Sequence, residues 1–298
     1  MSTGKLLLGL IGAGIRDSLT PAMQEEEARH HGLRLHYQLI DLDATPGAAH
    51  QLPALLAAAR IMGFAGLNIT YPCKQAVIPL LDALSPQAEA MGAVNTVVIR
   101  EGRSVGHNTD GWGWAWGLRR TLPDADLRCV VLLGAGGAGS AIAHAVLGMG
   151  AQELRIVDRE APRARALADA LSARYGARVE AHADVARALD GAAGLIHATP
   201  TGMAKLPGMP LPAALLRPAL WVSEIVYFPI ETELLKAALA AGCRIVDGGA
   251  MAVGQAVGAF ELFTGRVADP GRMEAHFRRL LAARRPRLLN TGAVHAAP

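Results

Sequence analysis

The chain has 298 residues, of which 51% are hydrophobic and 18% are charged, and its formal net charge is +3. This length and apolar fraction are sufficient for two domains with a large core. The main basic cluster, Arg278 to Arg287, has no nucleic-acid recognition motif beside it. We therefore interpret it as a solvated helix end and expect no nucleic-acid partner.

The first apolar run, Leu6 to Ile11, is too short to cross a membrane and carries no cleavage pattern. Longer apolar stretches are interrupted by glycine, proline or charge, so we expect no membrane association. The three cysteines, Cys73, Cys129 and Cys243, stand far apart and form no metal-type pair. Their odd number, without a secretion signal, predicts a protein of the reducing cytoplasm that holds no metal.

Predicted strands and helices alternate along the first hundred residues. The helix that ends at Gly32 has a strong start signal, because the Thr20 hydroxyl suits an N-cap and Pro21 suits the first helical position. Further helices are predicted over 52–62, from Cys73 to about Leu81, and over 87–91. Strands are predicted over 6–11, 35–40, 66–70 and 93–99. This alternation predicts a mostly parallel sheet.

Two glycine-rich turns follow apolar strands. The first, Gly12-Ala13-Gly14, lacks the third glycine of a dinucleotide loop, because Asp17 stands there. The second follows the strand 130–133 and fits G-x-G-x-x-G with Gly134, Gly136 and Gly139, after which small apolar residues continue at helical spacing. These glycines suit a tight turn, a close pyrophosphate and a helix packed on its strand, respectively. The N–H groups that begin the helix would face the phosphates.

The rest of the chain repeats the strand–helix pattern. A turn-rich hinge is predicted at 106–111, and the helix 112–122 leads into the dinucleotide unit. We predict strands over 153–157, 194–197, 221–227 and 244–246, and helices over 161–175, 232–241, 251–264 and 270–281. Apolar residues at helical spacing in the last two helices, such as Phe260 and Phe263, need a sheet to cover. We therefore place these helices back on the first domain.

The predicted fold is α/β with two domains. An N-terminal substrate domain with a mostly parallel sheet spans 1–109 and is completed by C-terminal helices over 248–288. A Rossmann-type dinucleotide-binding domain spans 110–247, and we expect 289–298 to be a flexible tail.

Two stretches of the first domain place polar groups where core residues would be expected. Asn68 and Thr70 lie at the carboxyl end of a strand, where open α/β sheets bind ligands. Lys74 follows in the first turn of a helix, where a cation is unfavourable by about 0.3–1 kcal/mol. Lys74 is either a proton-exchanging amine or a lysine that reaches solvent or a carboxylate. Asp110 is either a helix cap or the acid that acts with this lysine.

The ordered motifs resemble the shikimate dehydrogenase family, and are closest to its quinate/shikimate dehydrogenase branch. They cover roughly residues 7–280: Gly9 to Gly12, Ser18-Leu19-Thr20-Pro21, Asn68 to Lys74, Gly92 to Thr96, Asn108-Thr109-Asp110, Gly134 to Gly139, Ala198 to Met203, Tyr227 with Pro229, and Gln255-Ala256.

The resemblance implies a role for each matching residue. Lys74 and Asp110 would be the catalytic pair, and Ser18 and Thr20 would bind the substrate carboxylate. Contacts to the carboxylate or the ring hydroxyls would come from Asn68, Thr70, Asn95, Tyr227 and Gln255. The nucleotide would be held by Gly134, Ala135, Gly136, Gly137, Ala138, Gly139, Asp158, Arg159, Thr199, Met203, Val226, Gly248 and Met251.

Three positions depart from the family pattern. Ser18-Leu19-Thr20 replaces Ser-x-Ser, which is compatible with quinate and its additional hydroxyl. Asp158-Arg159-Glu160 replaces the Asn-Arg-Thr of NADP-dependent relatives, and a carboxylate at Asp158 would repel a 2′-phosphate. This favours NAD, although Arg159 could still assist NADP. Glu224 stands where the family has aspartate, and we attach no function to it.

The expected function is therefore reversible NAD-dependent oxidation of quinate or shikimate to the 3-dehydro acid, by a cytoplasmic monomer or homodimer. Alternatives are an NADP-dependent shikimate dehydrogenase, an aminoshikimate-type dehydrogenase, and a nucleotide-sensing regulator without catalysis. A regulator could dispense with Lys74 and Asp110, whereas both are present here.

Overall fold

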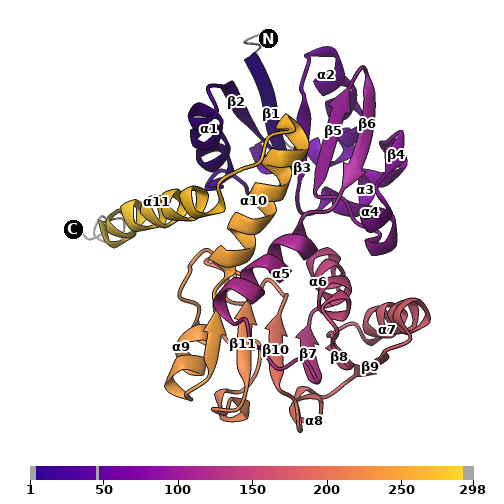
Figure 1. The fold of residues 1–298 in the computed structure, drawn as a ribbon, viewed down its shortest axis with the longest axis vertical. Coiled ribbons are helices and arrows are strands. Elements are labelled where there is room, and N and C mark those ends of the chain that lie inside the picture. Colours follow the sequence, from indigo (N-terminus) through magenta and orange to yellow (C-terminus); the bar gives the residue numbers. More distant parts are fainter. Residues whose placement is uncertain (1–4, 45–46, 291–298) are drawn as a thin grey trace, which may run out of the picture.

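The computed structural model describes residues 5–44 and 47–290 and contains two six-stranded sheets, one above the other in Figure 1. The first sheet has the strand order β2-β1-β3-β5-β6-β4. Its strands are β1 (Lys5–Gly12), β2 (Arg34–Asp41), β3 (Gly66–Ile69), β4 (Ala83–Leu84), β5 (Thr96–Arg100) and β6 (Arg103–His107). The pairs β1–β2, β1–β3 and β4–β6 are parallel, whereas β5 is antiparallel to both β3 and β6. The prediction of a mostly parallel sheet is thus confirmed, but the β5–β6 hairpin was missed.

The helices of this half follow the predicted order with different ends. They are α1 (Thr20–His30), α2 (Leu52–Ile61), α3 (Cys73–Ala76) and α4 (Pro86–Met91). The predicted helix from Cys73 to Leu81 was wrong, because α3 is a single turn followed by a 3-10 turn at Ile78–Leu80. Pro79 has no N–H to continue an α-helix, which explains the break.

Other predicted boundaries also need correction. Thr20 is the first residue of α1 and not its N-cap, and no side chain caps this helix. The strand predicted to start at residue 93 begins at Thr96. Gly106 and His107, predicted to lie in a hinge, belong to β6. Much of the predicted flexible tail, residues 291–298, lies outside the described residues.

The second sheet is entirely parallel, with the order β12-β11-β10-β7-β8-β9. Its strands are β7 (Cys129–Leu133), β8 (Glu153–Val157), β9 (Arg178–His182), β10 (Gly194–His197), β11 (Trp221–Glu224) and β12 (Arg244–Val246). This is the doubly wound order of dinucleotide-binding folds, with the direction of winding reversed between β7 and β10. The α/β fold class and the Rossmann-type sheet are therefore confirmed, although β9 was not predicted.

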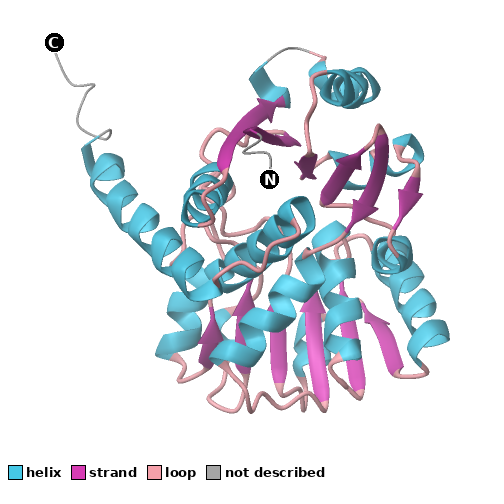
Figure 2. Ribbon diagram, turned by 45° about the horizontal axis from the view of Figure 1, so that its top comes forward, coloured by secondary structure: helices cyan, strands magenta, loops and turns pink. Residues whose placement is uncertain are grey.

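Helices cover both faces of this sheet (Figure 2). They are α5 (Asp110–Thr121), α6 (Gly137–Gly148), α7 (Ala161–Tyr175), α8 (Val185–Leu189) and α9 (Glu233–Ala240). Alternate residues of β7 face opposite cores: Val130 and Leu132 pack with α5, α6 and α7, while Val131 and Leu133 pack with α8 and α9. The continuous apolar run of β7 follows from burial on both faces.

The last two helices return to the half that holds the first sheet, as predicted: α10 (Gly248–Thr264) packs on the sheet, and α11 (Pro270–Asn290) packs on α1 and α10 and extends to the side (Figure 1). Phe263 packs with Leu8 and Val98 of that sheet, and Phe260 packs in a core with α1. Helix α10 also crosses α5 closely, since a Cβ built on Gly113 would lie 2.3 Å from the Gln255 nitrogen. Glycine at this crossing lets the two helices meet beside Asp110.

Among the described residues, no helix is both long and apolar enough to span a membrane. The same part of the chain contains no group of three or more His, Cys, Asp or Glu arranged to hold a metal ion. The three cysteines are free and buried, and burial raises the pKa of each thiol. The arginine cluster is not a wholly solvated helix end, because Arg278 pairs with Asp247 and Arg284 donates to the Asp17 carbonyl.

Candidate active site

Lys74 and Asp110 meet between the two sheets. Lys74 Nζ lies 2.5 Å from Asp110 Oδ2, and their side chains are 19% and 6% exposed. Lys74 comes from α3, directly after β3, and Asp110 is the first residue of α5. The single-turn α3 has little dipole, so the helix-dipole argument for an unfavourable Lys74 does not hold. The pairing brings an amine and a carboxylate together, as acid–base chemistry requires.

The Asp110 carboxylate does not cap α5, because Thr109 is the N-cap and makes no side-chain cap bond. The backbone N–H of Asp110, at the start of the helix, donates to Asn108 Oδ1 at 3.0 Å. Asn95 Nδ2 donates to Asp110 Oδ1 at 2.8 Å, so each carboxylate oxygen has a partner. The carboxylate is thereby held in one orientation, with its second oxygen facing Lys74.

Two of the predicted substrate contacts are deeply buried and already bonded to protein. Asn95 is 3% exposed, and Nδ2 donates to both Thr109 and Asp110. Asn68 is 4% exposed, accepts from the Tyr37 hydroxyl and donates to Thr96. In this geometry Asn95 orients Asp110 from behind, and direct contact of either asparagine with a substrate stays a prediction.

The other predicted substrate residues are partly exposed: Ser18, Thr20, Thr70, Tyr227 and Gln255. Ser18 Oγ accepts from the Thr20 N–H at 3.3 Å, which leaves its hydroxyl hydrogen available. Burial of its hydroxyl raises the pKa of Tyr227, with a further rise from Asp110 and an opposing effect from Arg284, although the residue as a whole is 36% exposed. The Gln255 side-chain amide donates to the Ala252 carbonyl, and the Gln255 backbone carbonyl accepts from the hydroxyl of Thr109, next to Asp110.

The second glycine-rich turn has the geometry of a dinucleotide loop. Gly134 has φ +101°, which favours glycine, and a Cβ on Gly139 would lie 1.9 Å from the Gly134 carbonyl oxygen. Nothing lies within 4 Å of the Cβ position at Gly136, so the backbone there is open to a ligand. Helix α6 starts next, at Gly137, without a side-chain cap. Its first N–H groups have no partner within the helix and suit a pyrophosphate.

This loop faces the amine–carboxylate pair. A Cβ built on Gly137 would lie 3.7 Å from Lys74 Cδ and 3.9 Å from Ala93 Cβ. The start of α6 and the lysine stem thus lie close together, and a side chain at position 137 would touch Lys74. A nucleotide on this loop would lie next to Lys74.

Asp158 follows β8 and anchors the glycine loop. Its Oδ2 accepts from the Ala135 N–H at 2.7 Å, and Oδ1 accepts from the Glu160 N–H at 2.8 Å. A carboxylate oxygen has a second lone pair, so Asp158 can still accept from ribose hydroxyls. Arg159 beside it is exposed and has no hydrogen-bond or ion-pair partner within 5–44 and 47–290. These residues fit a nicotinamide dinucleotide, and the exposed Arg159 guanidinium is available to bind an additional phosphate.

The family model described as "Shikimate dehydrogenase substrate binding domain" matches residues 10–97. A shikimate dehydrogenase (NADP(+)) of Streptomyces avermitilis is 56% identical over 278 residues, which are 92% of this chain and 96% of that protein. The chain belongs to the shikimate dehydrogenase family.

Two further comparisons are with proteins named for quinate. A quinate/shikimate dehydrogenase (NAD(+)) of Corynebacterium efficiens is 49% identical over 93% of this chain and 99% of that protein. The structure of quinate dehydrogenase from Corynebacterium glutamicum in complex with NAD aligns with a TM-score of 0.86 and 46% identity, over 93% of this chain and all of that one. The resemblance to the shikimate dehydrogenase family is thus confirmed.

The remaining predicted nucleotide residues follow β10 or β11 in the chain, or lie at the start of α10. A Cβ on Gly134 would lie 3.0 Å from Thr199 Cγ2, so Thr199 packs on the glycine turn. Val226 is buried, and a Cβ on Gly248 would lie 2.3 Å from its carbonyl oxygen. Met203 is 41% exposed and Met251 is partly buried. Their contact with a nucleotide stays a prediction.

One buried polar pair next to the glycine loop, His197 and Glu224, was not predicted from the sequence. His197 and Glu224 are buried side by side at the ends of β10 and β11, and they contact Thr199 and the backbone of Val226. The departure at Glu224 was noted without a role. A polar residue at the end of each of two neighbouring buried strands was the signal that could have indicated the pair.

Proposed function

We propose that the protein is a quinate/shikimate dehydrogenase, which reversibly oxidises a ring hydroxyl of quinate or shikimate to the 3-dehydro acid with NAD. The observation that carries this proposal is the Lys74–Asp110 pair beside the start of α6. We further propose that 1–109 with 248–288 bind the acid and that 110–247 bind the nucleotide.

In the proposed reaction, Lys74 Nζ handles the proton of the reacting hydroxyl. The bound nucleotide supplies the hydride acceptor. During oxidation Lys74 Nζ takes up the hydroxyl proton, and during reduction it returns the proton. Asp110 Oδ2 holds the lysine at 2.5 Å and is itself held by Asn95. The pair therefore approaches the hydroxyl in a fixed orientation, which lowers the entropic cost of the reaction.

The acid itself would be held by its carboxylate. Ser18 and Thr20 lie just before and at the start of α1, where hydroxyl hydrogens and the helix end favour an anion. The Tyr227 hydroxyl, which is protonated at neutral pH and can donate, would bind the carboxylate or a ring hydroxyl. Enclosing the acid between the sheets would exclude water from the hydride path.

NAD is the proposed cofactor because the Asp158 carboxylate would repel a 2′-phosphate and accept from free ribose hydroxyls. Arg159 is the specific observation that favours a second candidate, NADP-dependent shikimate oxidation, since its guanidinium is exposed beside Asp158. Relatives named for each nucleotide are similar to this chain, at 56% identity for NADP and 49% for NAD.

A steady-state comparison tests the proposal. Purified protein is assayed with quinate, shikimate and an amino analogue, each with NAD and NADP. The proposal expects the highest kcat/KM for quinate or shikimate with NAD. Equal or better rates with NADP would contradict the Asp158 argument, and nucleotide binding without oxidation of any acid would favour a sensing protein.

We also propose that the enzyme acts in the cytoplasm as a monomer or homodimer. Light scattering after size exclusion measures the oligomeric state, for which we expect a mass of one or two 31.1 kDa chains.

A further inference from the structure

A buried histidine–glutamate pair joins the ends of two neighbouring strands. His197 ends β10 and Glu224 ends β11, and the two residues are opposite each other in the sheet register. Both side chains are 0% exposed, and His197 Nδ1 lies 2.9 Å from Glu224 Oε1 and 3.0 Å from Oε2. The mechanism above uses neither residue.

The hydrogen bonds that Glu224 accepts from other groups determine which residue donates in the His197–Glu224 pair. Oε1 accepts from the N–H groups of Ile225 and Val226 at 2.8 and 2.9 Å, and Oε2 accepts from the Thr232 hydroxyl at 3.1 Å. An ionised carboxylate only accepts, so the ring hydrogen of His197 must lie on Nδ1. In a neutral ring, Nε2 is then left as an acceptor.

This arrangement sets the orientation of the Thr199 hydroxyl. Its Oγ1 lies 2.5 Å from His197 Nε2, so its hydroxyl hydrogen points to the ring. The Thr201 N–H approaches the same oxygen at 3.3 Å, while the methyl group packs on Gly134. The threonine therefore has a fixed rotamer, and its oxygen can only accept from a ligand on the glycine loop.

We propose that His197 and Glu224 are positioning residues for the nucleotide, which act by keeping the Thr199 oxygen a hydrogen-bond acceptor. The inference rests on the proposed function, because it takes the glycine loop to hold a dinucleotide. The pair also fixes the other side of the site, since Glu224 orders the turn that leads to Val226 and Tyr227.

The variant Glu224→Gln reverses this chain of hydrogen bonds while retaining its shape. The amide oxygen can keep the N–H groups of Ile225 and Val226, and the amide nitrogen then faces His197 Nδ1. The ring hydrogen moves to Nε2, Thr199 accepts it, and the threonine hydrogen turns toward the nucleotide. We expect the Kd for NADH, measured by nucleotide fluorescence without any acid, to rise about tenfold, as for one lost hydrogen bond.

Two further variants separate positioning from general destabilisation. Thr199→Val should weaken NADH binding by a similar factor, and adding Glu224→Gln to it should cause no further loss. Ser223→Ala is the matched control, because Ser223 is buried on the same strand and accepts from Trp114 Nε1 at 2.9 Å, away from Glu224. It should lower the melting temperature and leave the Kd for NADH unchanged.

The tautomer can be read from the nucleotide-free protein by nitrogen-15 NMR of His197. The expected result is hydrogen on Nδ1 in the wild type and on Nε2 in Glu224→Gln. A doubly protonated ring in the wild type, an unchanged Kd in Glu224→Gln, or an equal loss in Ser223→Ala would overturn the proposal. Wild-type protein that binds NADH but oxidises no acid would contradict only the proposed function.

Discussion

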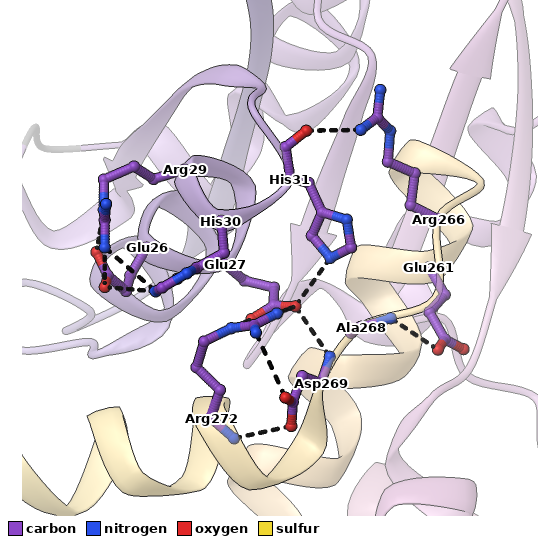
Figure 3. A network of polar contacts seen from close by, with 10 residues as sticks. All are labelled: Glu26, Glu27, Arg29, His30, His31, Glu261, Arg266, Ala268, Asp269 and Arg272. Atoms are coloured by element: carbon purple, nitrogen blue, oxygen red, sulfur yellow. Dashed lines mark hydrogen bonds and ion pairs between the residues drawn. The ribbon is translucent and has the colours of Figure 1, made fainter.

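Glu27 and Asp110 are both buried carboxylates paired with a cation, but they differ in how many hydrogen bonds each carboxylate and its cation make. Glu27, on α1, is 0% exposed and accepts from Arg272 Nε and Nη2 at 2.8 and 2.6 Å and from the Asp269 N–H at 2.9 Å, with His31 Nε2 at 3.0 Å (Figure 3). Asp110 accepts from Lys74 and Asn95.

The two cations differ even more. Arg272 binds Glu27 with two nitrogens and turns its third to Asp269. Lys74 Nζ has three possible donors and, among the described residues, makes one hydrogen bond. The saturated Glu27 pair fastens α1 to the start of α11, whereas the Lys74 pair retains donors for a ligand. Unused hydrogen-bonding capacity at a buried pair is therefore what marks the candidate site.

The largest change in activity is expected for Lys74→Met, which removes the cation of the Asp110 pair. Loss of a positioned proton-transfer group should lower kcat for the acid by about 10²–10⁴-fold. The melting temperature should fall less than on breaking the fully buried Glu27 pair, because the lysine side chain is 19% exposed and Asp110 keeps its hydrogen bond from Asn95. Steady-state kinetics and calorimetry measure the two quantities. Wild-type turnover in this variant would remove the proposed role of Lys74.

The opposite pattern is expected for Arg272→Met. Breaking the pair leaves a fully buried Glu27 without its cation, which should lower the free energy of unfolding by about 3 kcal/mol. Urea unfolding measures this loss, while kcat in the folded protein should stay within about twofold, or 0.4 kcal/mol, of the wild type. Arg279→Met on the same helix is the control, because among the described residues Arg279 hydrogen-bonds only with His276. Comparable losses in both variants would contradict the structural assignment of the Glu27 pair.

Asp158 is an intermediate case, because it accepts two backbone N–H groups and retains lone pairs. Asp158→Asn should shift the ratio of kcat/KM values toward NADP by about tenfold, or 1.4 kcal/mol, since the charge that repels a 2′-phosphate is removed. Initial rates with both nucleotides give this ratio. An unchanged ratio would show that Arg159 or another group sets the preference.

The smallest effect concerns the pH dependence of stability. Burial raises the pKa of Glu27, but hydrogen bonds from Arg272, the Asp269 N–H and His31 outweigh it, and the pKa is lowered. A lowered folded-state pKa stabilises the protein above the unfolded value of about 4.3, and this stabilisation is lost as the pH falls through the folded value. The stability difference between wild type and Glu27→Gln, measured by urea unfolding, should therefore shrink from pH 5 to pH 3. A constant difference would contradict this account.

The sequence predicted the features that depend on short-range pattern. The G-x-G-x-x-G turn and the helix 161–175 are both observed. Local steric rules explain why α3 ended early, since Pro79 was in the sequence but its effect was not weighed. Such features need no knowledge of distant contacts.

Features that depend on distant pairing were not predictable in the same way. Glu27 and Arg272 are 245 positions apart, and His197 and Glu224 are 27 apart. The hydrogen bond from Asn95 to Asp110 was not predicted, because it depends on the β5–β6 hairpin and the start of α5. Only the folded arrangement determines which polar groups satisfy each other and which retain capacity for a ligand.

The most direct measurement is the crystal structure of the protein with NADH and quinate or shikimate. The account predicts that Lys74 Nζ lies within about 3.2 Å of the reacting ring oxygen, with Asp110 behind it and the nicotinamide on the opposite side of the ring carbon. A bound acid whose reacting hydroxyl meets another side chain, with Lys74 Nζ turned away toward solvent, would contradict the account.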